Sequence, residues 1–293
     1  MVTVSNSKII HATLGPDGTY SSQAAKQMMG VEGELLFYPT IGEVFKAVLS
    51  GEVQKGIVPI LNSGEGPVNP TMMALIACGA LVQIEEEFVL PINHVLVTRP
   101  GYTLEDVQVV YSHPQALGQC RRYLNGNLPN TRTVESNSTV AAVPDMLGSS
   151  VPAAAIAPQS VLKLYEGEIV PIKIGIQDNS HNETRFVMIG KVSGVLPGVT
   201  GQDITYLSFG FDDEDQPCLL QRALSCFSSL NINLRRVESR PDPMGCWKDI
   251  FILEAEGHRE DPVMQAALAS LRYVASTVTI WGSCLRATHK RIK

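Results

Sequence analysis

The fold is decided between residues 8 and 60, where KIIHATL (8–14) is followed by SSQAAKQMM (21–29), LLFY (35–38), IGEVFKAVLS (41–50) and GIVPI (56–60). The first, third and fifth segments are short apolar runs, which predict strands. The other two have helical patterns, most clearly residues 41–50, where apolar side chains recur at intervals of three and four. This alternation of strand and helix predicts a parallel or mixed α/β sheet.

The same alternation continues to residue 189, and a different order follows it. Three glycines and a proline fall within residues 194–201, which marks a domain boundary. Residues 203–285 are predicted to form strand, helix, strand, strand, helix and strand, and this βαββαβ order is the ferredoxin-like plan. We therefore expect an α/β protein with one domain at residues 8–193 and a ferredoxin-like domain at residues 203–285.

Length and composition exclude several classes of protein. A chain of 293 residues allows about two domains, and 44% hydrophobic with 18% charged residues is typical of a folded globular protein. The net charge of −6 and the pI of about 5.6 argue against a broad basic surface for nucleic acid. No apolar run reaches the ~18–20 residues of a membrane span, and the first ten residues lack the pattern of a secretory signal.

The cysteines are scattered, with no CxxC pair and no histidine at zinc spacing. We therefore expect free thiols, most of them buried as small apolar residues, in the reducing environment of the cytoplasm. The six positions are Cys78, Cys120, Cys218, Cys226, Cys246 and Cys284.

Five polar segments lie beside the predicted strands and helix starts. Ligands bind beyond the carboxyl ends of strands in open α/β sheets, so these segments are candidates for one shared cleft. They are rich in neutral donors and poor in Asp and Glu, which suits a small anionic ligand. Each taken singly also has a plain structural interpretation as a helix cap, a turn or an edge strand. The segments are LGPDGTYS (14–21), VPILNSGEG (58–66), YSHPQA (111–116), SNST (136–139) and NETRF (182–186).

Metal and nucleotide chemistry find no support in these segments. None supplies three or four ligands at metal spacing, so we expect no metal site. The chain also contains no P-loop, GxGxxG or GxSxG motif.

Four segments, in this order along the chain, resemble motifs of the prephenate dehydratase family: residues 14–21, 56–66, 112–116 and 182–186. The C-terminal block resembles the ACT regulatory domain of the same enzymes, most clearly at NINL (231–234) and ESRP (238–241). The resemblance covers roughly residues 10–285.

The resemblance implies a two-lobed catalytic domain, similar to periplasmic binding proteins, with the active site between the lobes. Lobe one is expected at about residues 8–80 and 180–193, and lobe two at about residues 81–179. The implied reaction is the decarboxylating dehydration of prephenate to phenylpyruvate in phenylalanine biosynthesis, without a cofactor. A homodimer or homotetramer is implied, with phenylalanine as a possible effector of the ACT domain. The residues implied there are Leu219, Asn233, Leu234, Glu238, Ser239, Arg240 and Pro241.

Prephenate carries two carboxylates and a ring hydroxyl, so the resemblance assigns roles by substrate group. Thr184 is the candidate that hydrogen-bonds or protonates the leaving hydroxyl, and Asn62 and Gln115 orient the substrate. Arg185 is expected to bind a carboxylate, and Phe186 to pack under the ring. The remaining substrate-binding candidates are Ser63, for orientation, and Thr19, Ser21, Ser112 and Ser138, for carboxylate contacts.

Departures from the family pattern leave alternatives open. Leu61 stands where the family usually has Glu, and Met73 where it usually has Asp. One alternative that these losses favour is a decarboxylase, which removes carbon dioxide from prephenate but keeps its ring hydroxyl. The second alternative is a non-catalytic metabolite sensor. Pro217 and Cys218 replace a Gly-Ala pair, and proline lacks a backbone N–H, which predicts poor phenylalanine binding. Prephenate and its amino analogue arogenate are not distinguished.

Overall fold

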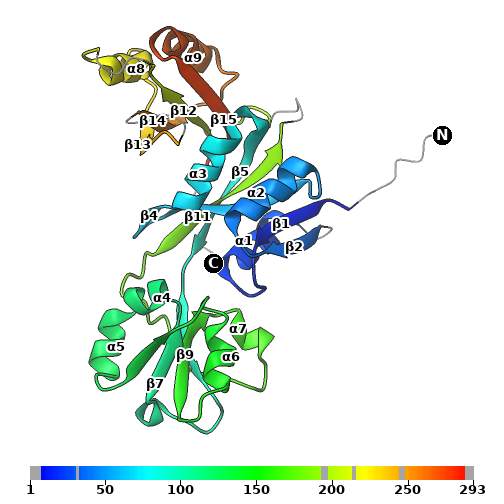
Figure 1. Ribbon diagram of the computed structural model, residues 1–293, viewed down its shortest axis with the longest axis vertical. Coiled ribbons are helices and arrows are strands. Elements are labelled where there is room, and N and C mark those ends of the chain that lie inside the picture. Colours follow the sequence, from blue (N-terminus) through cyan, green and yellow to red (C-terminus); the bar gives the residue numbers. More distant parts are fainter. Residues whose placement is uncertain (1–7, 31–32, 193–196, 213–215, 244–247, 288–293) are drawn as a thin grey trace, which may run out of the picture.

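The computed structural model describes residues 8–30, 33–192, 197–212, 216–243 and 248–287, so Gly194 of the predicted boundary and Cys246 lie outside the described residues. Three units follow one another along the long axis of the molecule, with lobe one in the middle (Figure 1). Lobe two lies at one end and the C-terminal domain at the other.

Lobe one is a mixed sheet in the order β2-β1-β3-β11-β5, with the short β4 paired to β3. β1 is parallel to β2 and β3, whereas β11 is antiparallel to β3 and β5. The expected α/β sheet is confirmed, and α2 spans the predicted residues 41–50. The elements are β1 (Ile10–Leu14), α1 (Tyr20–Met28), β2 (Glu34–Tyr38), α2 (Ile41–Ser50), β3 (Lys55–Asn62), β4 (Gly66–Pro67), α3 (Asn69–Cys78), the 3-10 turn η1 (Gly79–Leu81), β5 (Val82–Pro91) and β11 (Glu183–Lys191).

Lobe two is a second sheet, in the order β10-β6-β9-β7-β8. Its helices pack on both faces, around two apolar clusters built on Val95 and Val97 and on Leu96 and Ile156. The predicted helix over residues 114–124 is interrupted at Cys120 and forms two shorter helices. The elements are β6 (His94–Thr98), the 3-10 turn η2 (Leu104–Asp106), β7 (Val109–Ser112), α4 (Pro114–Gln119), α5 (Arg121–Asn127), β8 (Arg132–Glu135), α6 (Ala142–Leu147), β9 (Ala153–Pro158), α7 (Val161–Leu164) and β10 (Val170–Ile174).

The boundary between the lobes differs from the expected one. Lobe two begins near His94 and not at residue 81, because β5 belongs to the sheet of lobe one. The pairing of β5 with β11 runs from Val82 opposite Lys191 to Pro91 opposite Glu183. Local apolar runs cannot reveal this pairing, since its partner strand lies about a hundred residues further along the chain. The chain crosses between the lobes twice, after β5 and before β11.

The C-terminal domain has the predicted βαββαβ order, and its sheet order β13-β14-β12-β15 is ferredoxin-like. Both helices pack on one face of the sheet around Phe209, Phe227, Leu253 and Leu271. The elements are β12 (Asp203–Gly210), α8 (Leu219–Ser228), β13 (Leu234–Pro241), β14 (Asp249–Glu256), α9 (Pro262–Val274) and β15 (Thr277–Leu285).

The other face of that sheet packs on lobe one, and we call this contact the junction. Tyr206, Ile252 and Trp281 share one buried cluster with Ile84 and Val187 of lobe one. At Gly282 (φ +148°) the backbone of β15 comes so close to β5 that a Cβ atom would lie 2.2 Å from the carbonyl oxygen of Ile84. Only glycine fits there, so the sequence enforces this close approach.

None of the described helices is long and apolar enough to cross a membrane. The five described cysteines carry free thiols, as expected. Burial raises the pKa of Cys120 to about 12, so this thiol is inert at neutral pH.

Candidate active site

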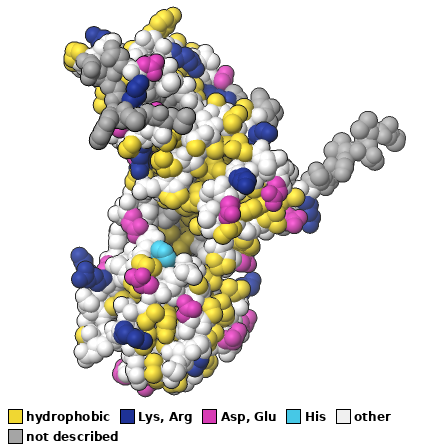
Figure 2. Space-filling model, in the orientation of Figure 1, with side chains coloured by type: hydrophobic (Ala, Val, Ile, Leu, Met, Phe, Trp, Pro, Cys, Tyr) yellow, Lys and Arg dark blue, Asp and Glu magenta, His cyan; other side chains and the backbone are white. Residues whose placement is uncertain are grey.

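The five polar segments converge on one cavity of about 390 Å³ between the lobes, which we call the cleft. Figure 2 shows the hollow, whose visible wall is mainly apolar, with a histidine at its edge. Among the described residues that line it there is no Asp, Glu, Lys or Arg. The residues that contribute from the predicted segments are Leu14, Gly15, Thr19, Tyr20, Ser21, Pro59, Asn62, His113, Gln115, Ala116, Asn137, Ser138, Thr139, Thr184 and Phe186.

Asn62 and Thr184 form the polar centre of the cleft. They lie opposite each other on β3 and β11, and Asn62 Nδ2 donates to Thr184 Oγ1 at 3.0 Å. Asn62 is itself fixed, because its Oδ1 accepts from the backbone N–H groups of Gly64 and Glu65. Since Thr184 Oγ1 receives this bond, its own hydroxyl proton is directed to another acceptor. The pair is buried, so a ligand in the cleft is a natural acceptor.

Helix starts and short turns place further neutral polar groups at the cleft. Thr19 caps α1, accepting from the N–H of Ser22, and the buried Ser21 lines the cleft in the first turn of that helix. Ser138 Oγ accepts from the N–H of Ala141 at 3.0 Å and also lines the cleft. Because the N-terminal N–H groups of α1 are directed along the helix axis, this edge favours an anion.

Hydrogen bonds join the two lobes around the cleft. The carboxylate of Glu65, in lobe one, accepts from Gln115 Nε2 at 2.5 Å and from Gln119 Nε2 at 2.9 Å, both on α4 of lobe two. Gln119 Oε1 then lies 2.9 Å from His94 Nε2, and His94 Nδ1 lies 3.0 Å from the hydroxyl of Tyr20. Burial lowers the pKa of His94, so the neutral imidazole is favoured.

Sequence reasoning missed Gln119 and His94 as cleft residues, whereas Tyr20 lies within the predicted segment 14–21 but was not named as a site residue. Gln119 lies four positions after Gln115, on the same helical face, so helical periodicity was sufficient to find it. His94 had no such signal, because it reaches the cleft only through the pairing of β6 within lobe two.

Three predicted site residues do not line the cleft. Arg185 points away from it, because successive side chains on a strand alternate between faces and Thr184 and Phe186 occupy the cleft face. Ser112 is fully buried and donates to the carbonyl of Ile156 at 2.7 Å, so its hydroxyl is committed to the sheet. Ser63 contacts the first residue of β11, accepting from the N–H of Glu183 at 3.0 Å. These positions correct the expectations of substrate contacts for Arg185, Ser112 and Ser63.

The two missing carboxylates also map outside the cleft. Leu61 precedes Asn62 on β3 and therefore faces the junction side, where it lies opposite Arg185. Met73 lies on α3, is 40% exposed and does not line the cleft. A carboxylate at either position would therefore not line the cleft in this chain.

The C-terminal candidates do not converge on one cavity within the chain. Asn233 lines a cavity of about 190 Å³ with Asp261 and Met264. Glu238 instead pairs with Arg236 and Arg240 on the same strand, and Arg240 reaches Asn69 of lobe one at 2.7 Å. The other candidates lie apart from that cavity: Leu219 in the first turn of α8, Leu234 at the start of β13, and Ser239 and Pro241 near its end. Within the described parts of the chain, no three His, Cys, Asp or Glu residues are placed to hold a metal ion.

Comparisons with known proteins find relatives over most of this chain. The family model described as prephenate dehydratase matches residues 11–193. A bifunctional chorismate mutase/prephenate dehydratase of Aquifex aeolicus (strain VF5) is 35% identical over 280 residues, which cover 96% of this chain and 74% of that relative.

Two solved structures are similar over nearly the whole chain. The prephenate dehydratase of Arthrobacter aurescens in complex with L-Phe has a TM-score of 0.88 and 32% identity, covering 95% of this chain and 90% of that one. A protein described as a novel type of quorum-quenching acylase has a TM-score of 0.84 and 25% identity, covering 96% and 100%.

Proposed function

Because the chain belongs to the prephenate dehydratase family, we propose that its cleft converts prephenate to phenylpyruvate, carbon dioxide and water. The observation that carries the proposal is the hydrogen bond from Asn62 to Thr184, which leaves the threonine proton for the substrate. This arrangement favours an enzyme over the sensor alternative, because the Thr184 hydroxyl is available to hydrogen-bond the leaving oxygen during the reaction.

The reaction needs little from the protein beyond position and one donor. The bond between the ring and its carboxylate breaks, and its electron pair enters the ring as carbon dioxide leaves. The carbon–oxygen bond at the opposite ring carbon then breaks, and the ring becomes aromatic. The leaving hydroxide accepts the hydrogen bond of Thr184, and a proton taken up from solvent balances the reaction as water. A donor aimed at the departing oxygen stabilises the charge that develops there.

The uncharged lining suits this chemistry. Helix N-termini and hydroxyls bind carboxylates without a fixed cation, so the departing carboxylate is not held back by an ion pair. The same lining favours prephenate over arogenate, because the ammonium group of arogenate would lose its hydration with no Asp or Glu among the described lining residues to replace it. Prephenate is therefore our proposed substrate.

The positions of Leu61 and Met73 support dehydration over simple decarboxylation. Both lie outside the cleft, whereas Thr184 and Asn62, which act on the hydroxyl in our proposal, line it. The substitutions therefore remove no group from the surroundings of the leaving oxygen.

Product analysis tests the proposal. The purified protein is incubated with prephenate, and the product is identified by mass spectrometry and ultraviolet absorbance. We expect phenylpyruvate from the wild type and far less from Thr184→Ala. A non-aromatic product that has lost carbon dioxide but kept its hydroxyl would make the protein a decarboxylase. Turnover of an N-acyl amide but not of prephenate would favour the acylase-like activity of its structural relative.

The same membership supports three further proposals. We propose a cytoplasmic biosynthetic enzyme that is a homodimer or homotetramer. We also propose L-phenylalanine as effector of the C-terminal domain, because a structural relative was solved with L-Phe. Pro217 and the left-handed Cys218 (φ 66°) before α8 are expected to weaken that binding. Light scattering and isothermal titration with L-phenylalanine test the oligomer and the effector.

A further inference from the structure

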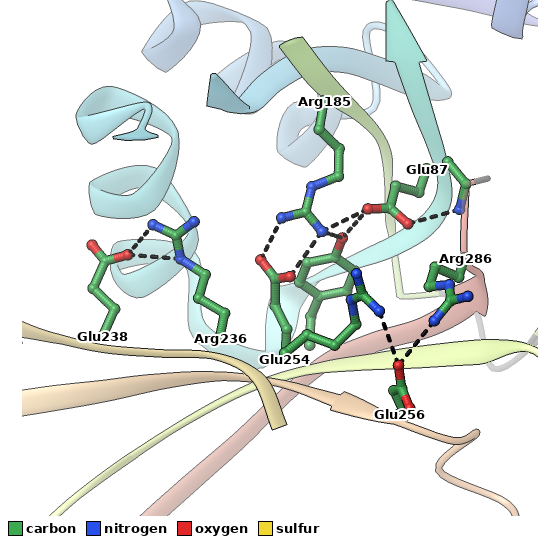
Figure 3. Close-up of polar contacts among 10 residues, drawn as sticks. Glu87, Arg185, Arg236, Glu238, Glu254, Glu256 and Arg286 are labelled. Atoms are coloured by element: carbon green, nitrogen blue, oxygen red, sulfur yellow. Dashed lines mark hydrogen bonds and ion pairs between the residues drawn. The ribbon is translucent and has the colours of Figure 1, made fainter. Parts of the chain in front are cut away.

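Arg185 lies at the junction, next in sequence to Thr184 but on the opposite face of β11. Its guanidinium contacts three side chains that we call, together with Arg185, the junction network: Glu87 of β5 and Tyr206 and Glu254 of the C-terminal domain (Figure 3). The network therefore joins the strand that carries Thr184 to the C-terminal sheet.

The contacts to Glu254 have the geometry of a clamp. Arg185 Nη1 donates to Glu254 Oε2 at 2.8 Å and Nη2 donates to Glu254 Oε1 at 3.0 Å, which is a bidentate pair. Such pairs fix orientation as well as distance, because both planar groups must align. One side chain of β14 thus holds the start of β11 in a defined position.

Glu87 completes the network from lobe one. Its Oε1 accepts from Arg185 at 2.7 Å and from the hydroxyl of Tyr206 at 3.0 Å, and its Oε2 accepts from the N–H of Ala287 at 2.9 Å. The side chains of Glu87 and Glu254 are 1% and 3% exposed, and that of Arg185 is 15% exposed. Burial alone would lower the pKa of Arg185, but Tyr206, Glu254 and Glu87 raise it overall, so the guanidinium stays charged.

Because Arg185 lies between two buried carboxylates, its side chain is held in one position, unlike the side chains of an exposed ion pair. The hydrogen bonds of the guanidinium go to Glu87, Tyr206 and Glu254, and the network lies on the far side of the sheet from the cleft, so a substrate in the cleft does not contact it. What it can act on is the backbone of β11, where the pairing with β3 is irregular between Arg185 and Phe186. Such an irregularity locally disrupts the backbone ladder, so a side-chain clamp at Arg185 can add to the backbone pairing that positions Thr184.

We propose that Arg185 is a positioning residue, which holds Thr184 in its productive place by clamping the start of β11 to Glu254 of the C-terminal domain. The C-terminal domain is then part of the catalytic architecture, whether or not an effector binds to it. The proposal rests on the proposed function for its kinetic part, because it concerns the turnover of prephenate. A displacement of about 1 Å at a catalytic group can cost as much as about a hundredfold in rate.

Glu254→Gln is the informative variant, and Glu256→Gln is its matched control. Glu254→Gln keeps the shape of the side chain and leaves Arg185 paired with Glu87, so no unpaired charge is created. Glu256 lies two residues further along β14 and pairs with Arg235 and Arg286, without contact to Arg185. We expect Glu254→Gln to lower kcat at least fivefold with KM within twofold, and Glu256→Gln to leave both unchanged.

Arg185→Lys separates the two interpretations of Arg185. Lysine keeps the charge but cannot form the bidentate pair. A positioning role predicts a lower kcat with unchanged KM, as for Glu254→Gln. A strong rise in KM with Arg185→Lys alone would return Arg185 to substrate binding and overturn the proposal. Unchanged kcat in Glu254→Gln would also overturn it.

Hydrogen exchange gives a readout that does not depend on the reaction. Amides of residues 183–186 are expected to exchange faster in Glu254→Gln than in Glu256→Gln or the wild type. If the wild type fails to convert prephenate, the proposed function falls while the exchange comparison still tests the clamp. Equal exchange in all three proteins would overturn the clamp even if prephenate is converted.

Discussion

The cleft and the junction lie on opposite faces of β11, and they treat polar side chains differently. On the cleft side of β11, Thr184 and Phe186 lie in a cavity whose described lining contains no Asp, Glu, Lys or Arg. On the junction side, one residue away, Arg185 is enclosed by buried carboxylates. The strand period of two separates a binding face from an anchoring face within three residues.

The difference teaches how a site can keep unused donors inside a folded protein. At the junction one cation lies between two buried carboxylates, so removing Arg185 would leave uncompensated buried charge, which is costly. In the cleft the polar groups are neutral, and they can face an open cavity at lower cost. Donors in the cleft that have no partner within the protein can therefore donate hydrogen bonds to a substrate.

Gly282→Ala breaks the junction and is expected to have the largest effect. A Cβ atom would lie 2.2 Å from the carbonyl oxygen of Ile84, so β15 must move away from β5. We expect a loss of about 3 kcal/mol in the free energy of unfolding, measured by denaturant titration. Gly101→Ala is the control, because Gly101 also has positive φ but open space around it, and its cost should be about 1 kcal/mol. Equal losses would mean that the close approach is not tight.

Thr184→Ala breaks the cleft while leaving the junction intact. Loss of a donor to the leaving group should lower kcat about a hundredfold and change KM by less than about threefold, because the bond matters mainly in the transition state. Steady-state kinetics with prephenate measure both. Thr184→Ser keeps the hydroxyl and should retain most of the activity. If Thr184→Ala matched the wild type in kcat, Thr184 would have no part in the mechanism.

Ser138→Asp gives the cleft the charge it lacks. Aspartate can still accept from the N–H of Ala141, so the local turn should survive. Its negative charge opposes the dianionic substrate, and we expect KM to rise about tenfold with an unchanged melting temperature. Ser138→Asn keeps the shape without the charge and should bind normally. A rise in KM with asparagine as well would indicate a steric cause and not an electrostatic one.

The sequence was sufficient to predict which loops form the cleft, because each polar segment lies beside a strand or helix start that has a local pattern. It was also sufficient for the βαββαβ order and for α2, whose apolar spacing is unambiguous. The direction of Arg185 was available too, since alternation along β11 puts it opposite Thr184.

The partners of Arg185 were not available from sequence. Glu87 and Glu254 are 98 and 69 residues away along the chain, and no local period links them to β11. The lobe boundary failed for the same reason, because β5 is assigned to lobe one by its pairing with β11 and not by its own residues. Long-range pairing is therefore the part of this fold that propensity and periodicity do not encode.

Low pH is expected to add a positive charge to the cleft by protonating a histidine. Of the changes considered, it should have the smallest effect on the protein. His94 lines the cleft, and acid can convert its imidazole to a cation. Burial lowers the pKa of His94, so the unfolded chain takes up this proton before the folded chain does. Stability should therefore be full above the unfolded pKa of about 6.5 and fall as the pH drops below it, by up to about 1.4 kcal/mol for each unit of the pKa difference.

The variant His94→Gln tests this prediction, because glutamine does not titrate. Burial also lowers the pKa of His11, so the wild type has at least two contributors to the acid slope, and His11→Asn serves as the parallel control. The free energy of unfolding, measured from about pH 7.5 to about pH 5, should decline less steeply in His94→Gln than in the wild type. An unchanged slope in His94→Gln, with a reduced slope in His11→Asn, would show that protonation of His94 does not oppose folding. In that case the hydrogen bonds of His94 to Gln119 and Tyr20 would accommodate the imidazolium, and the cleft would tolerate a positive charge.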